Sequence, residues 1–255
     1  MNRIWAVALF TMREALWRKA WLPFVGLTIL AFILVFVQFG ASLTFSWQNP
    51  YADNIISSFF FFWSWGTLAT GLILGCTSLP IERRARMMFT LPMERWQLIA
   101  GKLIGAQILL SALVLVGYGL CIALALRQHL PILPFSRLGL VTALCSIFVC
   151  LCLSIPLGLK LSSPAAGTLS VFLVLLPAFF EALASRGLLQ EKWIVTAITY
   201  LLPFRVSTHP MNNAFWNSIV EASHYTKLGW SVLFSFLFFL ILLTLFRRSE
   251  LSTKS

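Results

Sequence analysis

The sequence predicts an all-α integral membrane protein, and two observations support this fold class. Of its 255 residues, 59% are hydrophobic and only 11% are charged, with a mean hydropathy of +0.88. Its apolar residues also form several continuous runs of about 20 residues, the length that crosses the ~30 Å hydrocarbon core as a helix. A transmembrane β-barrel has alternating segments of about ten residues instead. We therefore expect residues 1–255 to form a single transmembrane domain with six membrane-crossing helices.

The N-terminal segment, residues 2–19, favours a helix that lies in the membrane interface. At 100° per residue, one face of this segment is apolar and consists of Ile4, Trp5, Ala8, Leu9, Met12 and Leu16. The opposite face is charged and consists of Arg3, Arg13, Glu14 and Arg18. These charges also exclude a cleavable signal peptide, which needs an uninterrupted apolar region.

Six apolar segments are expected to cross the membrane. In order, they cover about residues 21–40, 55–79, 96–126, 138–159, 165–184 and 228–246. The third is long, so we expect its first turns, with Lys102, to reach the headgroups. The stretch 185–225 has no apolar run long enough to cross, and it predicts two short re-entrant or interfacial helices on the outer side.

The basic residues indicate how the chain is oriented. Six crossings place both termini on one side of the membrane, and cytoplasmic loops carry an excess of Lys and Arg. With cytoplasmic termini, thirteen of the 19 basic residues lie on the inner side of the membrane. The other six lie on the outer side: Arg127, Arg137, Arg186, Lys192, Arg205 and Lys227. We interpret the net charge of +11 as a sign of orientation and not of nucleic-acid binding.

A dense charged stretch, LPIERRARMMFTLPMERWQLIAGK (79–102), separates the second and third predicted spans. Residues 80–91 fit a short amphipathic helix with Met88 and Phe89 near one face, and Pro92 ends it. A new helix then begins near Arg95 and continues into the third span. The coupling segment, as we call residues 80–95, would form a cytoplasmic elbow suited to docking a partner. The alternative is an ordinary loop whose arginines contact lipid phosphates.

Catalytic and metal-binding patterns are missing from the sequence. No G-x-x-x-x-G-K-[ST] loop occurs, because Gly101-Lys102 is followed by Leu103 and position 96 is a tryptophan. The histidines His129, His209 and His224 lack zinc-site spacing, Asp53 is the only aspartate, and no cysteines form a C-x-x-C pair. Glu181, the one acid inside a predicted span, lies about one turn from Arg186, which favours a structural role. We expect this chain to bind no cofactor or metal and to have no enzyme activity.

The charged stretch resembles the cytoplasmic coupling segment of exporter-type ABC transporter permeases, whose subunits have six spans. The residues that carry the likeness are Glu82, Arg83, Met87, Met88, Phe89, Leu91, Pro92, Arg95, Gly101 and Lys102. The N-terminal helix is similar to the family's interfacial elbow helix, the stretch 185–225 to its outward-side re-entrant helices, and SSPAAG (162–167) to its turn before the fifth span. The family often has Gly-Thr where this chain has Arg86-Met87, which bears on the shape of the elbow and on the type of ATPase that fits it.

The resemblance implies a permease subunit of a bacterial cytoplasmic membrane, paired with a second copy or a homologue and driven by two ATP-binding subunits. ATP and Mg²⁺ would be bound by those subunits. The residues implied to contact the ATPase are Glu82, Arg83, Arg84, Arg86, Met88 and Phe89. An alternative is a mechanotransmitting or assembly component that acts on an extracytoplasmic protein partner, since maturation permeases related to nitrous-oxide reductase assembly are similar in size and layout. The sequence indicates neither substrate nor direction of transport.

Overall fold

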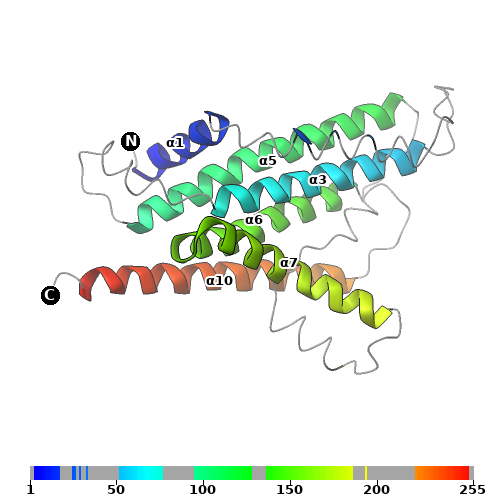
Figure 1. Cartoon of the computed structure of the whole chain (residues 1–255). Helices are drawn as coiled ribbons and strands as arrows, with labels where there is room; N and C mark the ends of the chain where they lie inside the picture. Colours follow the sequence, from blue (N-terminus) through cyan, green and yellow to red (C-terminus); the bar gives the residue numbers. More distant parts are fainter. Residues whose placement is uncertain are drawn as a thin grey trace.

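The computed structural model describes five stretches of the chain, residues 3–17, 52–76, 95–127, 136–185 and 222–252, and a few isolated positions (25, 26, 29, 33 and 193). The five stretches are helical throughout, apart from the short turn at 161–162. Their helices are α1 (Arg3–Trp17), α3 (Ala52–Cys76), α5 (Arg95–Arg127), α6 (Ser136–Lys160), α7 (Ser163–Ser185) and α10 (Ala222–Ser252). The all-α fold class is therefore confirmed for the described part of the chain (Figure 1).

Three of these helices are long and apolar enough to cross a membrane. They contain the stretches Phe59–Cys76, Trp96–Arg127 and Gly139–Gly158. Shorter apolar helical stretches occur at Ser163–Leu176 in α7 and Leu228–Ile241 in α10. Most of the predicted first span, the coupling segment before Arg95 and most of 185–225 lie outside the described residues, so the six-span arrangement stays a prediction.

Helix α6 is the centre of the described bundle, because it packs against α3, α5, α7 and α10. The side chains at 149–155 are all buried, with at most 1% of their surface exposed. Such burial explains why α6 is apolar all round and not on one stripe, since a helix covered on every side has no solvent face. Pro156 lies inside α6 and removes one backbone N–H from the helix ladder.

A tight turn joins α6 to α7. Only Leu161 and Ser162 separate the two helices. The Leu161 N–H donates to the Leu157 carbonyl at 2.9 Å, and the Ala166 N–H donates to the Ser162 carbonyl at 2.8 Å. Pro164 falls in the first turn of α7, where its missing N–H costs no intrahelical hydrogen bond. The two helices therefore form a compact hairpin.

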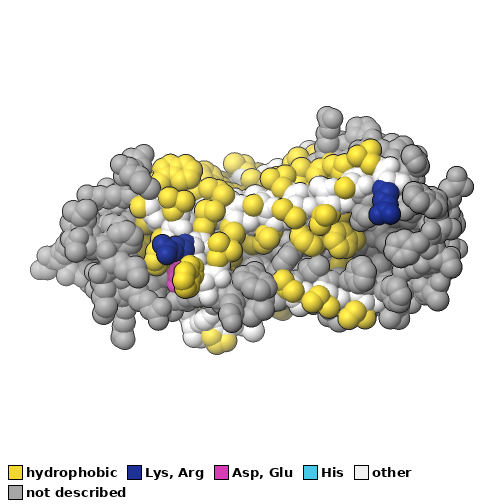
Figure 2. Space-filling view, turned by 90° about the horizontal axis from the view of Figure 1, so that it is seen from above, with side chains coloured by type: hydrophobic (Ala, Val, Ile, Leu, Met, Phe, Trp, Pro, Cys, Tyr) yellow, Lys and Arg dark blue, Asp and Glu magenta, His cyan; other side chains and the backbone are white. Residues whose placement is uncertain are grey.

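The outer surface of the described bundle is largely apolar. Large hydrophobic side chains are exposed along α5, α7 and α10, among them Leu115, Phe172 and Ile241. Figure 2 shows hydrophobic side chains along much of the described part of one face, with Lys and Arg at two places near opposite ends. An exposed apolar surface of this extent is typical of contact with lipid.

Candidate coupling site

The six predicted contact residues, Glu82, Arg83, Arg84, Arg86, Met88 and Phe89, lie outside the described residues. What the structure does describe is the pair of helices that the coupling segment connects. Helix α3 ends at Cys76, and α5 begins at Arg95. These two helices pack against each other, so their relative direction decides where the segment leaves and rejoins the bundle.

Contacts along α3 and α5 show that the two helices run antiparallel. Near the far end, the Cys121 thiol lies 4.0 Å from the Ile56 carbonyl oxygen, and the Trp63 indole N–H donates to the Leu113 carbonyl at 2.8 Å. Closer to the coupling segment, a Cβ added at Gly71 would lie 3.0 Å from a methyl carbon of Leu110. Residue numbers thus rise along α3 as they fall along α5. In Figure 1, α3 ends and α5 begins on the same side of the bundle, where α1 also lies and α10 ends.

Helix α1 packs directly on the first turns of α5 through two glycines. A Cβ added at Gly101 would lie 2.7 Å from the Val7 Cβ and 2.8 Å from the Ile4 carbonyl oxygen. A Cβ added at Gly105 would lie 2.5 Å from the Ala8 carbonyl oxygen. Real Cβ atoms do not approach other atoms so closely, so only glycine permits this spacing. The two backbones are in contact, and α1 and α5 form one close-packed pair.

The packed face of α1 differs from the apolar face that the sequence predicts. Val7, Ala8, Thr11 and Ala15 are buried, whereas large members of the predicted face are about half exposed: Trp5, Leu9 and Leu16. Small side chains let the helix approach the glycines of α5, and the bulky ones would hold it away. The prediction of a helix over residues 2–19 is confirmed for 3–17, and its large exposed apolar residues do not form the contact with α5. Its position in the membrane interface stays a prediction.

Lys102 is buried within the protein, with 5% of its surface exposed. The expectation that the first turns of this helix reach the headgroups stays a prediction. It follows Gly101, where α1 covers α5, and it lies near enough to Cys76 to act electrostatically on that thiol. Ionisable groups inside membrane segments are rare and mark functional positions by default. This one follows the glycine of α5 that α1 covers and lies near Cys76, the last residue of α3 before the coupling segment.

A second close-packed pair consists of α3 and α6. A Cβ added at Gly75 would collide with the hydroxyl of Ser154, and one added at Gly158 would lie 2.9 Å from the Gly75 carbonyl oxygen. These two helices therefore also approach to backbone contact. The Cys76 thiol extends the junction to α7, since it lies 3.9 Å from the Ser170 hydroxyl.

The spacing of small residues was available in the sequence and was missed. Gly71 and Gly75, Gly101 and Gly105, and Ser154 and Gly158 are each four residues apart. Residues at this spacing share one face of a helix, and small residues there let two membrane helices approach closely. This pattern would have indicated which helix faces pack closely, which hydropathy alone does not.

The described interior holds polar groups that the sequence did not single out. Gln107 of α5 donates from Nε2 to the Ser111 hydroxyl at 3.3 Å and to the Leu144 carbonyl of α6 at 3.4 Å. Its amide oxygen is buried and has no hydrogen-bond partner among the described residues. The same is true of the hydroxyls of Ser64, Ser146 and Ser154. Such groups are costly in an apolar interior. No group of three His, Cys, Asp or Glu residues suited to a metal ion is found within the described residues.

Comparisons with known proteins do not assign the chain to a family. No protein-family model matches it, and no curated protein matches it either.

Proposed function

We propose that this chain is the transmembrane permease subunit of an ATP-driven ABC transporter, which receives force through the coupling segment, residues 80–95. One observation carries this proposal. The segment connects α3 to α5, and these helices belong to two different close-packed pairs, α3 with α6 and α5 with α1. A displacement of the segment therefore acts on both pairs at once.

The contacts between the pairs suit a lever. Trp63 anchors α3 to α5 far from the coupling segment, through its hydrogen bond to the Leu113 carbonyl. Trp63 lies thirteen residues before Cys76, or about 20 Å along the helix at about 1.5 Å per residue. A rotation of about 10° about this anchor would move Cys76 by about 3.5 Å over that length. Movements of this kind, between rigid packed units, are typical of switching proteins.

The composition of the segment suits a docking surface. Met, Arg and aromatic residues are enriched at protein interfaces, and Met88, Phe89 and the arginines at 83, 84 and 86 supply all three. Two ATP-binding subunits would bind ATP and Mg²⁺, and each would contact the elbow of one permease copy or homologue. We place the assembly in a bacterial cytoplasmic membrane, with both termini of this chain inside.

The proposal is tested by affinity purification of the full-length chain from membranes of its source organism, followed by an assay of ATP hydrolysis and identification of the retained proteins. The coupling variant carries Arg83→Ala, Arg84→Ala and Arg86→Ala. A matched control removes three predicted outer-side charges instead, with Arg127→Ala, Arg137→Ala and Arg186→Ala. Both variants should insert equally into the membrane.

We expect the unmutated chain and the outer-side control to retain an ATP-hydrolysing subunit, and the coupling variant to lose it. Retention of that subunit by the coupling variant at the level of the control would contradict the docking role of the segment. Recovery of the unmutated chain without any nucleotide-binding protein would contradict the permease function itself.

A further inference from the structure

The junction of α3 and α5 contains a buried charge that the coupling mechanism proposed above does not use. Lys102 has 5% of its surface exposed, and the hydrophobic side chains near it along α5, Ile99, Leu103 and Ala106, are buried as well. An ammonium group in such surroundings is costly unless an electronegative group lies close to it. The charge therefore needs compensation from within the fold.

The register of the two helices places Lys102 at the C-terminal end of α3. The helices are antiparallel, and Gly71 of α3 lies against Leu110 of α5. From that contact, Cys76 lies five residues farther toward the coupling segment, or about 7.5 Å at 1.5 Å per residue. Lys102 lies eight residues farther in the same direction, or about 12 Å. The two residues therefore differ by only about 4.5 Å along the helix axes, and Lys102 acts electrostatically on the Cys76 thiol.

The end of α3 is an electronegative group of the required kind. The aligned peptide dipoles of a helix place about half a negative elementary charge at its C-terminus, and lysine side chains can donate hydrogen bonds to its last carbonyls. A basic residue in the last turn of the same helix can supply this interaction, but α3 (Ala52–Cys76) has none there. Lys102, on the neighbouring helix, lies where such a residue would act.

We propose that Lys102 is a positioning residue, whose ammonium group holds the C-terminal end of α3 against the first turns of α5. The two helix ends that the coupling segment joins are thereby kept together. This contact does not depend on the permease function, whereas its meaning for force transfer rests on that function.

Under the proposed function, Lys102 opposes the movement that force on the coupling segment produces. A rotation of about 10° at Trp63 displaces Cys76 by about 3.5 Å. A hydrogen bond between an ammonium nitrogen and a carbonyl oxygen, about 3 Å long, does not survive a displacement of this size. The attraction between the ammonium and the helix end would return the two ends to one position when the force stops.

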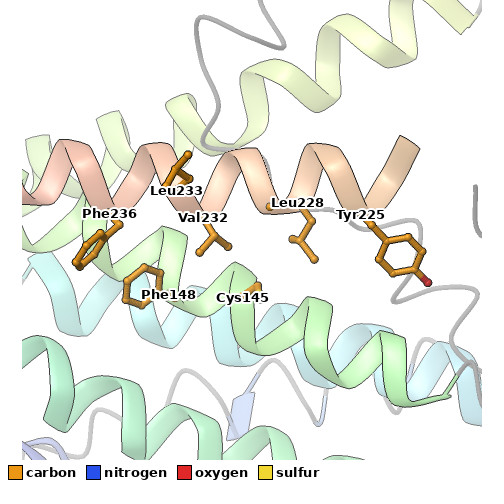
Figure 3. A pocket seen from close by; sticks show the side chains of 8 residues that line it. Cys145, Phe148, Tyr225, Leu228, Val232, Leu233 and Phe236 are labelled. Atoms are coloured by element: carbon orange, nitrogen blue, oxygen red, sulfur yellow. The ribbon is translucent and has the colours of Figure 1, made fainter. Parts of the chain in front are cut away.

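The test follows native cysteines in the purified full-length chain in nanodiscs, with a membrane-permeant maleimide and peptide mass spectrometry. Cys76 reports on the end of α3 near Lys102. Cys121 reports on the far end of the same helix pair, where its thiol lies 4.0 Å from the Ile56 carbonyl oxygen. Cys145 is half-buried beside an open hollow between α6 and α10 (Figure 3), so its rate is the reference for an accessible thiol.

Lys102→Met removes the charge and keeps a flexible apolar stem. We expect the reaction of Cys76 to accelerate by about tenfold relative to Cys145, while Cys121 stays as slow as in the unmutated chain. A factor of ten corresponds to about 1.4 kcal/mol, close to the lower end of what a hydrogen bond to a charged group contributes. Loss of the charge alone would not speed a thiol, because a nearby cation favours the reactive thiolate.

Two further variants separate the charge from general packing. Lys102→Arg keeps the cation, so Cys76 should react at close to its unmutated rate. Gln107→Met is the matched control, because it also replaces a polar side chain of α5 by methionine. Gln107 donates to the Leu144 carbonyl of α6 and not to α3, so its loss should leave the Cys76 rate unchanged.

Three results would overturn the proposal. They are an unchanged Cys76 rate in Lys102→Met, an equal acceleration of Cys76 and Cys121, and the same acceleration of Cys76 in Lys102→Arg or Gln107→Met. No ATPase takes part in this measurement. Its outcome is therefore independent of whether the chain retains an ATP-binding subunit on purification.

Discussion

The contact between α1 and α5 makes a sharp prediction for Gly105→Ala. The added Cβ would lie 2.5 Å from the Ala8 carbonyl oxygen and 2.9 Å from the Ala8 Cα. Both are backbone atoms, which cannot rotate away as a side chain can, so α1 must move by about 1 Å to restore ordinary contact distances. Overpacking of this kind costs about 1–3 kcal/mol. Alanine is also a better helix former than glycine by up to about 1 kcal/mol, which offsets part of the cost.

The net effect is a loss of about 1–2 kcal/mol from the docking of α1, equal to an increase of about 5- to 30-fold in the undocked population. The assay is hydrogen–deuterium exchange of the full-length chain in nanodiscs, measured on peptides from α1. Gly119→Ala is the matched control, because a Cβ at that position of α5 meets no described atom within 4 Å. Exchange in α1 should rise by about tenfold in Gly105→Ala, as expected for about 1.4 kcal/mol of lost protection. If α1 exchanges as slowly in Gly105→Ala as in Gly119→Ala and the unmutated chain, the backbone contact does not hold α1 on α5.

Three further outcomes follow from the described contacts. Trp63→Phe keeps an aromatic ring but loses the hydrogen bond to α5, so it should lower the free energy of unfolding by about 0.5–1.5 kcal/mol, measured by chemical unfolding in detergent. The control, Trp65→Phe, removes an indole N–H without a described partner and should cost clearly less. Equal losses in the two variants would contradict the role of the bond. Gly75→Ala should destabilise by about 1–3 kcal/mol in the same assay, and added Ser154→Gly should restore part of that loss; additive effects would show that the two residues do not press on each other. In the folded chain Cys145 should react with a membrane-permeant maleimide before the other four cysteines, as located by peptide mass spectrometry, and early reaction elsewhere would contradict the observed burial.

Hydropathy located the described helices well, because apolar run length responds directly to the thickness of the membrane core. The predicted fourth span, 138–159, differs from α6 (Ser136–Lys160) by two residues at one end and one at the other. The ends of α10 (Ala222–Ser252) extend six residues beyond the predicted span, 228–246, on both sides. Those added turns are polar, and a helix can continue past the apolar run that defines a span.

Packing was harder to predict than helix position. The 3.6-residue period located α1 but not its buried face. Trp5 and Leu9 belong to the apolar face that the period defines, and both are about half exposed instead of packed on α5. The burial of Lys102 likewise depends on how the other helices pack around α5, which no local pattern of charge or hydropathy encodes. For the predicted interface from Glu82 to Phe89, the described residues supply only the two helix ends that it joins.

The short turn between α6 and α7 bears on how the chain is made. Only Leu161 and Ser162 separate the two helices, so no soluble loop keeps them apart while the chain is synthesised. If both cross the membrane, as the sequence predicts, they would have to leave the translocon together, as one antiparallel unit. The most deeply enclosed helix of the described bundle would then be paired with α7 at the moment of insertion, before α10 has left the ribosome.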